Sequence, residues 1–265
     1  MLSVSYLHAA GHRLEYKWIH PRARVPERPP DAMPVLVFLH EGLCSVALWK
    51  NFPELVAERT GCSALVYSRY GYGKSDRLTE PRAVDYMHRE ALKSLPELLD
   101  ALSIRDPILI GHSDGASISI IYAGCGRRQV GGLVLMAPHV FVEGIAVAAI
   151  AQAKIAFETT DMAAKLGRRH EDAVGAFRGW NDIWLHPDFL AWNIESCLPG
   201  ITAPALLIQG EEDQYGTMAQ IEAIERQLGG SVDTVVLARC AHSPHVDQTP
   251  GTLDAIAQFV ESVRR

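Results

Sequence analysis

The sequence lacks the cysteine pattern of a disulfide-rich or zinc-binding protein. Its 265 residues contain five cysteines, an odd number, with no CxxC pair among them. They are Cys44, Cys62, Cys125, Cys197 and Cys240. Cysteines scattered in this way predict neither a disulfide framework nor a zinc site, and we expect reduced thiols.

Long apolar runs are also missing. The N-terminal segment 1–18 interleaves its apolar residues with His12, Arg13, Glu15 and Lys17, so it has no unbroken signal-peptide core. No later run is long enough to cross a lipid bilayer. We therefore expect a cytoplasmic globular protein without a membrane partner.

Basic residues are too few to outnumber the acidic ones. The formal net charge is −6 and the isoelectric point is about 6.0. A mildly acidic protein does not attract phosphate backbones or anionic lipid surfaces. We expect no nucleic-acid partner, a small molecule as the substrate, and a monomer or homodimer.

Short apolar runs divide the chain at regular intervals. A proline-rich loop, residues 21–34, precedes the first of them. Because each run is continuously apolar, it is typical of a strand buried on both faces of a parallel sheet. The runs are 35–39, 64–67, 108–110, 133–136, 205–208 and 235–237.

Segments with helical spacing lie between these runs, at 86–102, 116–122, 218–228 and 253–263. Pro96 should kink or divide the first of these helices. Strands that alternate with helices predict an α/β fold, with a mostly parallel central sheet flanked by helices.

Residues 139–199 interrupt the alternation, because they contain no clear strand but many aromatic and helix-compatible stretches. We expect a small helical cap here, inserted into a core formed by residues 1–138 and 200–265. The alternative is a set of additional helices on the face of the sheet.

The strongest chemical signal is the segment Gly111-His112-Ser113-Asp114-Gly115, which follows an apolar run and precedes a helix. This is the strand, sharp turn and helix of a G-x-S-x-G nucleophile elbow. Glycines two residues either side of the serine remove Cβ atoms that would collide where strand and helix converge. We therefore predict that Ser113 is a nucleophile.

A serine hydroxyl needs a base, and the base needs an acid to orient it. The run 205–208 leads into Glu211-Glu212-Asp213, and the run 235–237 leads into His242 and then His245. The order serine, acid, histidine along the chain agrees with an α/β hydrolase. Loops at the carboxyl ends of parallel strands meet at one edge of the sheet.

Over nearly its whole length the chain resembles the α/β-hydrolase family, and in particular serine esterases with a helical cap. The G-x-x-D segment 210–213 and the histidine after the last strand are similar to those of the family. The resemblance implies Asp213 as the acid, in preference to Glu211 and Glu212. It implies His242 as the base, in preference to His245.

The segment His40-Glu41-Gly42-Leu43 is similar to the H-G-x motif that forms half of the family's oxyanion hole. The resemblance implies the N–H of Gly42 as one donor, or that of Leu43 if Glu41 is an insertion. The N–H of Asp114 would be the other donor. Glu41 departs from the family, and its carboxylate would oppose a developing negative charge unless it is neutralised or points away.

Motifs for cofactors are incomplete. Gly73-Lys74-Ser75 ends like a phosphate-binding loop, but Ser68 stands where that loop needs glycine. His40-Glu41 begins like the zinc motif H-E-x-x-H, but Cys44 stands in the fifth place. We expect no cofactor and no metal.

The predicted activity is hydrolysis of a carboxylic ester of a small or medium, largely apolar substrate, through an acyl-enzyme on Ser113. We expect substrate contacts from His139, Phe141, Trp180 and Trp184. Hydrolysis of a lactone, amide or carbon–carbon bond, a cofactor-free dioxygenase and a non-catalytic ligand sensor remain as alternatives. A haloalkane dehalogenase is disfavoured, because relatives of that kind carry aspartate where Ser113 stands.

Overall fold

The computed structural model describes residues 4–22, 33–126 and 128–264. Within them, eight strands form one sheet in the order β1-β2-β4-β3-β5-β6-β7-β8. Strands β3 to β8 pair in parallel, whereas β1 and β2 are antiparallel. The strands are Ser5–Ala9 (β1), His12–Ile19 (β2), Leu36–Leu39 (β3), Ala64–Tyr67 (β4), Ile108–His112 (β5), Gly132–Met136 (β6), Ala205–Gly210 (β7) and Val232–Leu237 (β8). The predicted α/β fold with a mostly parallel sheet is confirmed.

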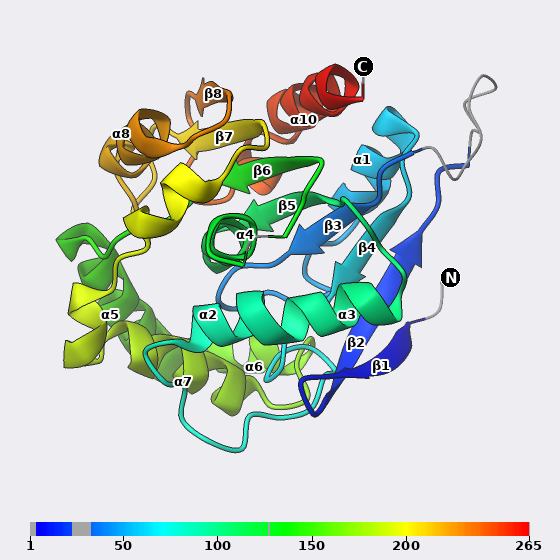
Figure 1. The fold of residues 1–265 in the computed structure, drawn as a ribbon. Coiled ribbons are helices and arrows are strands. Elements are labelled where there is room, and N and C mark those ends of the chain that lie inside the picture. The colour runs from blue at the N-terminus through cyan, green and yellow to red at the C-terminus, as the bar shows by residue number, and fades with distance from the viewer. Residues whose placement is uncertain (1–3, 23–32, 127, 265) are drawn as a thin grey trace.

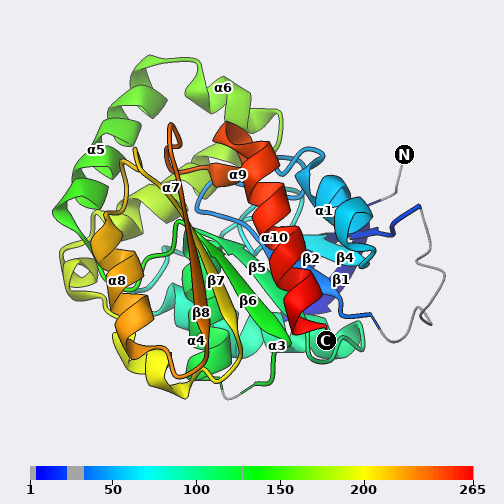
Figure 2. The ribbon, with the colours of Figure 1, turned by 90° about the horizontal axis from the view of Figure 1, so that it is seen from above.

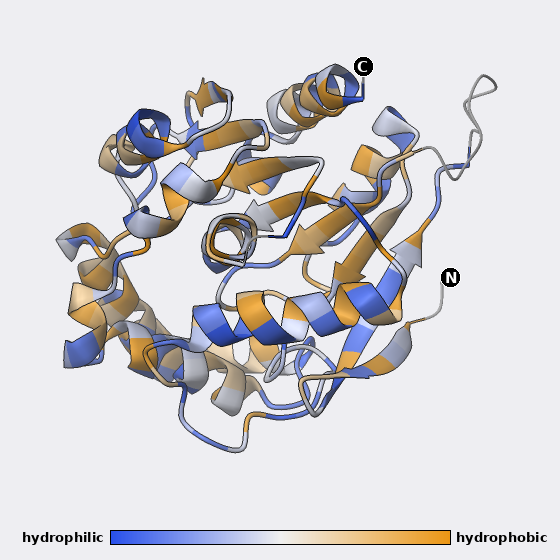
Figure 3. Cartoon of the chain, viewed as in Figure 1, coloured by the Kyte–Doolittle hydropathy of each residue, from blue (hydrophilic) through white to orange (hydrophobic). Residues whose placement is uncertain are grey.

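The six apolar runs correspond to β3–β8. Strands β3 to β7 are buried along their entire length, as expected for strands covered on both faces. Figure 3 shows these strands as mainly hydrophobic, in contrast to the mixed colours of the helices. The predicted loop 21–34 falls mostly outside the described residues, including Pro26, Pro29 and Pro30.

The N-terminal hairpin, β1 and β2, was not predicted from the sequence. Its turn consists of Ala10 and Gly11, which both have positive φ (52° and 84°), and Ala9 pairs with His12 across it. Positive φ at both central positions is typical of a type I′ hairpin. Because these two strands at one end of the sheet are only partly buried, they mix polar with apolar residues and show no apolar run.

Helices cover both faces of the sheet (Figures 1 and 2). On one face, α1 (Phe52–Thr60) and α10 (Thr249–Val263) pack on Leu36 and Phe38 of β3. On the other face, α4 (Asp114–Gly124) and α8 (Met218–Gln227) belong to the cluster that contains Val37 and Leu39. Alternate residues of one strand therefore enter two separate cores.

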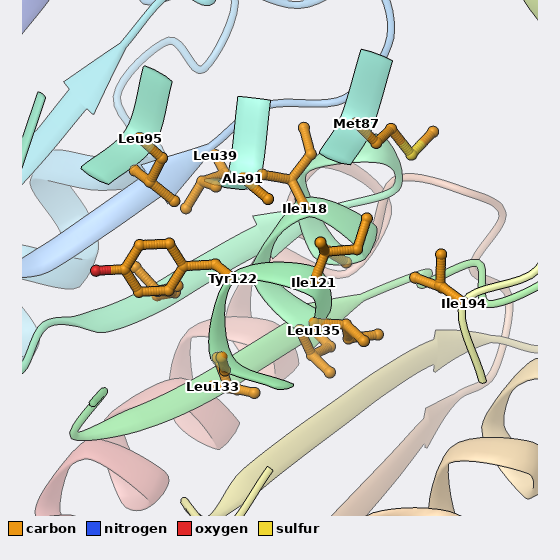
Figure 4. Close-up of a cluster of buried hydrophobic side chains, with 14 of the residues drawn as sticks. Leu39, Met87, Ala91, Leu95, Ile118, Ile121, Tyr122, Leu133, Leu135 and Ile194 are labelled. Atoms are coloured by element: carbon orange, nitrogen blue, oxygen red, sulfur yellow. The ribbon is translucent and has the colours of Figure 1, made fainter. Parts of the chain in front are cut away.

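Helix α4 is the most enclosed helix of the second core. Figure 4 shows Ile118, Ile121 and Tyr122 of α4 between Leu133 and Leu135 of β6 and the helix that contains Met87, Ala91 and Leu95. That helix is divided, as the sequence predicted. It consists of α2 (Tyr86–Arg89), a π-helical turn (η2, Glu90–Ser94) and α3 (Leu95–Ala101), and Pro96 is the second residue of α3.

Residues between β6 and β7 form only helices and loops, apart from a single β-bridge between Phe141 and Asn193. The helical segments, here called the insertion, are α5 (Gly144–Thr159), α6 (Met162–Gly167), α7 (Ala173–Trp184), η3 (Pro187–Ala191) and η4 (Glu195–Gly200). In Figure 1, α5 and α7 lie on the side toward which the arrows of β5 and β6 point. That the insertion is a separate cap stays a prediction.

A disulfide bond joins Cys125, just after α4, to Cys197 in η4. The prediction of reduced thiols is therefore wrong for these two residues, which are 72 positions apart. Sequence spacing does not reveal this pairing, because only the fold brings the end of α4 against the insertion. Cys44, Cys62 and Cys240 are free and buried.

Among the described residues, no helix combines the length and the apolar character needed to cross a membrane.

Candidate active site

Ser113 lies at the junction of β5 and α4, on the sharp turn that the sequence predicted. Its backbone has φ 52° and ψ −116°, an unfavourable conformation for a residue with a side chain. A Cβ on Gly111 would lie 2.4 Å from the carbonyl oxygen of Gly115. A Cβ on Gly115 would lie 2.0 Å from the carbonyl oxygen of Leu39 in β3. Both glycines are therefore required for the helix to start so close to the sheet.

Asp213 and His242 meet at the carboxyl ends of β7 and β8. Nδ1 of His242 lies 2.9 Å from each carboxylate oxygen of Asp213. The N–H groups of Tyr215 and Gly216 donate to Oδ1 of Asp213, and the Gln209 amide donates to Oδ2. Burial by itself would raise the pKa of Asp213, but hydrogen bonding and the charge of His242 lower it.

The other acids and the second histidine lie elsewhere. Glu211 and Glu212 are exposed. His245 is buried beside the rings of Trp49 and Phe52, at centroid distances of 4.8 and 5.4 Å. Of these candidates, the structure therefore brings only Asp213 and His242 together.

Close backbone packing fixes the position of His242. Nε2 of His112, which immediately precedes the nucleophile, lies 2.7 Å from the carbonyl oxygen of His242. A Cβ on Gly210 would lie 2.2 Å from the carbonyl oxygen of Cys240. The loop that carries His242 is thus held against both β5 and the end of β7.

A cavity of about 260 Å³ lies between these loops and the insertion. Its walls include seven of the ten predicted site residues: Gly42, Leu43, Ser113, His139, Trp180, Trp184 and His242. Asp213 lies behind His242. Asp114 is fully buried, and its carboxylate points away to Arg69, Tyr86 and Trp184. Phe141 is not among the lining residues; it pairs with Asn193 instead.

The two candidate oxyanion donors in the loop after β3 differ in what their N–H groups do. The N–H of Leu43 donates to a carboxylate oxygen of Glu41. Among the described residues, the N–H of Gly42 has no hydrogen-bond partner. As the first residue of α4, Asp114 has an N–H without an intrahelical acceptor. The geometry thus favours Gly42 over Leu43 beside Asp114.

Arg69 joins these two segments. Its Nη2 donates to the carbonyl oxygens of His40 and Glu41, at 3.2 and 3.0 Å. The same nitrogen lies 3.5 Å from the carboxylate of Asp114, and the Arg69 side chain is 1% exposed. The backbone N–H of Arg69 also donates to Nε2 of His40. One buried guanidinium therefore contacts both halves of the candidate oxyanion hole.

Two insertion tryptophans form much of the cavity wall. A Cβ on Gly42 would lie 2.1 Å from the indole Cδ1 of Trp180, so this ring lies directly against the loop after β3. The indole N–H of Trp184 donates to Tyr86 Oη and to Asp114. Both side chains come from α7 and line the cavity, while their contact with a substrate stays a prediction.

His139 lies beside the same cavity, with its ring 5.6 Å from that of His242. Burial, together with the nearby His242, lowers the pKa of His139 to about 4. The ring is therefore neutral at pH 7, and its Nδ1 has no partner among the described groups.

Several wall residues were not predicted. Ala146 and Ile150 come from α5, Gln214 and Tyr215 follow Asp213, and Ser243 follows His242. Adjacency to Asp213 and His242 was an available signal for the last three. For Ala146 and Ile150, the i, i+4 spacing indicates a shared helix face but not what that face covers. Among the described residues, no group of three His, Cys, Asp or Glu side chains is arranged to hold a metal ion.

Comparison with curated proteins gives a partial match. A haloalkane dehalogenase from Mesorhizobium japonicum is 31% identical over 103 residues, which are 39% of this chain and 31% of that protein. The match therefore spans about a third of that relative's length.

Matches to solved structures and to a family model extend over far more of the chain than the match to the dehalogenase. Proline iminopeptidase from Mycobacterium smegmatis superposes with a TM-score of 0.74 at 19% identity, over 99% of each chain. A thermophilic esterase from Thermogutta terrifontis gives a TM-score of 0.70 at 16% identity, over 99% of this chain and 100% of the esterase. At such identities the likeness establishes the fold. The model of the "Alpha/beta hydrolase family" matches residues 36–255. This chain belongs to the alpha/beta hydrolase family.

Proposed function

We propose that this α/β hydrolase cleaves a carboxylic ester of a small or medium, largely apolar substrate through an acyl-enzyme on Ser113. The observation that carries the proposal is the pairing of His242 Nδ1 with both oxygens of Asp213, 2.9 Å away, beside a cavity that Ser113 and His242 line together. Nucleophile, base and orienting acid are the three groups that acyl transfer requires.

The first half of the reaction forms the acyl-enzyme. His242 accepts the hydroxyl proton through its Nε2 while Ser113 Oγ attacks the ester carbonyl. Asp213 accepts the hydrogen bond from Nδ1 and stabilises the imidazolium. The N–H groups of Gly42 and Asp114 hold the oxyanion, a contribution of roughly 3–4 kcal/mol per donor in measured enzymes. The alcohol leaves with the proton from His242.

The second half releases the acid. A water molecule gives a proton to His242 as its oxygen attacks the acyl carbonyl, and the bond to Ser113 Oγ then breaks. The proton held by His242 returns to Ser113. The enzyme ends in its starting state, so no cofactor enters the balance.

Substrate size follows from the cavity. A volume of about 260 Å³, with Ile150, Trp180 and Trp184 among its walls, supports a compact and mainly apolar acyl or alkyl group. Longer chains require the insertion to move or the substrate to extend into solvent.

The test is labelling with a fluorophosphonate, followed by peptide mass spectrometry, alongside turnover of p-nitrophenyl acetate and butyrate. We expect an adduct on the peptide that contains Ser113, and loss of adduct and turnover in Ser113→Ala. His242→Ala should also lose the adduct. Ser243→Ala removes another hydroxyl from the same cavity and serves as the matched control, because its Ser113 peptide should still be labelled.

Two results would overturn the proposal. Full turnover in folded Ser113→Ala would exclude an acyl-enzyme on that residue, and oxygen uptake would then point to a cofactor-free dioxygenase. Folded wild-type protein with neither adduct nor turnover, but with saturable ligand binding, would instead identify a ligand sensor.

A further inference from the structure

Among the described residues that line the cavity beside Ser113, Glu41 is the one with an acidic side chain. Oε2 of Glu41 accepts the N–H of Leu43, while Oε1 has no hydrogen-bond partner among the described residues. No lysine or arginine is among the described residues that line this cavity. Among the described residues, the wall therefore presents a carboxylate that no lysine or arginine faces from within the cavity.

The nearest cation does not neutralise this carboxylate. The Arg69 guanidinium contacts the backbone carbonyl of Glu41, rather than its side chain, and lies 3.5 Å from the carboxylate of Asp114. The His242 ring is committed to Asp213 through Nδ1. The basic groups near Glu41 thus already have acidic or carbonyl partners.

Three aromatic side chains are among the other residues of the cavity wall. Trp180, Trp184 and Tyr215 line the cavity with Glu41, and Trp180 lies directly against the adjacent Gly42. Faces of such rings attract cations, most strongly where water is excluded. A carboxylate among aromatic rings is a combination that accommodates a positively charged nitrogen.

We propose that the cavity selects ester substrates that carry a positively charged nitrogen, either quaternary or a protonated amine, close to the scissile carbonyl, and that Glu41 determines this specificity. The inference rests on the proposed ester hydrolysis and extends it to a substrate class.

Partial burial of the uncompensated carboxylate gives the physical reason. Removal from water and the charge of Asp114 together raise the pKa of Glu41 to about 7, although the Leu43 N–H opposes them. A neutral substrate leaves this carboxylate without a cationic partner. A cationic substrate supplies the missing partner and favours the ionised form of Glu41.

This linkage predicts a pH dependence of selectivity. The charged groups that face Glu41 are Asp114, Arg69 and His242, and the titratable groups Cys44, Tyr72 and Tyr215 also interact with it. Because both substrates use the same triad, effects of pH on the triad cancel in a ratio of two substrates. The ratio of cationic to neutral substrate should therefore rise as the pH increases through about 7.

The experiment compares isosteric ester pairs. Choline butyrate is compared with 3,3-dimethylbutyl butyrate, which places the charge in the alcohol. An ester of trimethylammonioacetic acid is compared with the same ester of 3,3-dimethylbutyric acid, which places it in the acyl group. For each pair, kcat/KM is measured for wild type, Glu41→Gln and Glu211→Gln, with thermal melting to verify folding. Glu211 is the matched control because it is exposed and does not line the cavity.

We expect the cationic-to-neutral ratio to fall about tenfold in Glu41→Gln for at least one pair and to stay unchanged in Glu211→Gln. The wild-type ratio is divided by the Glu41→Gln ratio, so that any intrinsic difference in reactivity between the two esters cancels. The rise with pH should vanish in Glu41→Gln. An unchanged ratio for both pairs, with efficient turnover of the neutral esters, would overturn the substrate class while the ester hydrolase survives.

A binding measurement tests the cation site independently of the proposed ester hydrolysis. Calorimetric titration of Ser113→Ala with choline butyrate and with 3,3-dimethylbutyl butyrate needs no turnover. Tighter binding of the choline ester, lost in the double variant with Glu41→Gln, supports the cation site even if no ester is hydrolysed. Equal affinities for the two esters would contradict it.

Discussion

Arg69 connects two segments that are far apart in the chain. Its planar guanidinium contacts the carbonyls of His40 and Glu41 and the carboxylate of Asp114 at the same time. A lysine keeps the charge, but its nitrogen lies one bond closer to the backbone than Nη2, so it does not reach the same three oxygens. Arg69 is therefore a positioning residue for the candidate oxyanion hole, since it does not line the cavity.

From this geometry, Arg69→Lys should lower kcat for p-nitrophenyl butyrate by about 10- to 100-fold while KM changes much less. The control is Arg82→Lys. Arg82 is a nearby arginine that contacts the carbonyl of Tyr70 and the rings of Tyr72 and Tyr86, but not the oxyanion segments. An equal loss of kcat in both variants, or a change confined to KM, would show that Arg69 has no such role.

The residues of the site differ in how well the sequence predicts them. Ser113, Asp213 and His242 were predicted because each follows an apolar strand, and the fold brings those strand ends to one edge. Trp180 was predicted from the aromatic content of the insertion alone. The partner of the Leu43 N–H was not predictable, because it depends on the rotamer of Glu41 and not on residue spacing.

At the scale of elements, the junction of β5 and α4 has no spare room. The Cβ of an alanine at position 115 would lie 2.0 Å from the carbonyl oxygen of Leu39, which belongs to a neighbouring strand and cannot move independently. Gly144, at the start of α5, has nothing within 4 Å of a built Cβ. We therefore expect an added methyl group to destabilise the folded protein at position 115 but not at position 144.

Gly115→Ala should lower the free energy of unfolding by about 3 kcal/mol through this clash. Gly144→Ala should leave it unchanged or raise it by about 0.5 kcal/mol, because alanine restricts the unfolded chain. Urea denaturation monitored by tryptophan fluorescence measures both. Equal midpoints for the two variants would mean that the junction tolerates a methyl group.

Elements differ in how clearly the sequence reveals them. The strands β3–β7, buried on both faces, are continuously apolar and were located within one or two residues. The hairpin β1–β2 lies at one end of the sheet and is only partly buried. Its residues mix polar with apolar side chains, so they form no continuous apolar run. The break in the helix that contains Pro96 was predicted from that proline. No sequence pattern predicted that the break would be a π-helical turn before it.

At the scale of the molecule, the disulfide Cys125–Cys197 ties the end of α4 to the last helical turn of the insertion. The loop it closes spans 72 positions and contains β6 and almost all of the insertion. On chain-entropy grounds, a loop of this length stabilises the folded protein by about 4 kcal/mol.

Dithiothreitol should therefore shift the urea midpoint to lower concentration, by an amount equivalent to about 4 kcal/mol or less. Cys125→Ser should unfold at that lower midpoint with or without the reductant. Cys240→Ser, which removes a free buried thiol, is the control that keeps the dependence on dithiothreitol. If dithiothreitol left the urea midpoint of the wild type unchanged, the disulfide would contribute nothing to stability.

Buried histidines make the stability of the whole molecule depend on pH. Burial and the nearby His242 together lower the pKa of both His139 and His245 to about 4. An unfolded histidine titrates near 6.5, so the unfolded chain binds protons first as the pH falls. Stability is then lost between pH 6.5 and 4, by on the order of 3 kcal/mol for each histidine.

Glu41 acts in the opposite direction. Its pKa is raised to about 7, so its protonation between pH 7 and 4.5 recovers part of the loss. Because more than one histidine is affected, the net free energy of unfolding should fall in acid. Urea denaturation at pH 7.5, 5.5 and 4.5 measures this fall, which His245→Gln should reduce. A free energy of unfolding that is constant across this range would contradict the account.

Position 42 combines two properties of the cavity wall. The absence of a side chain lets the Trp180 ring rest against the loop, and the same residue offers the unpaired N–H. Any larger residue would displace the ring and disturb the amide in a single step. A larger residue at position 42 should therefore change the cavity wall and the candidate oxyanion hole at once.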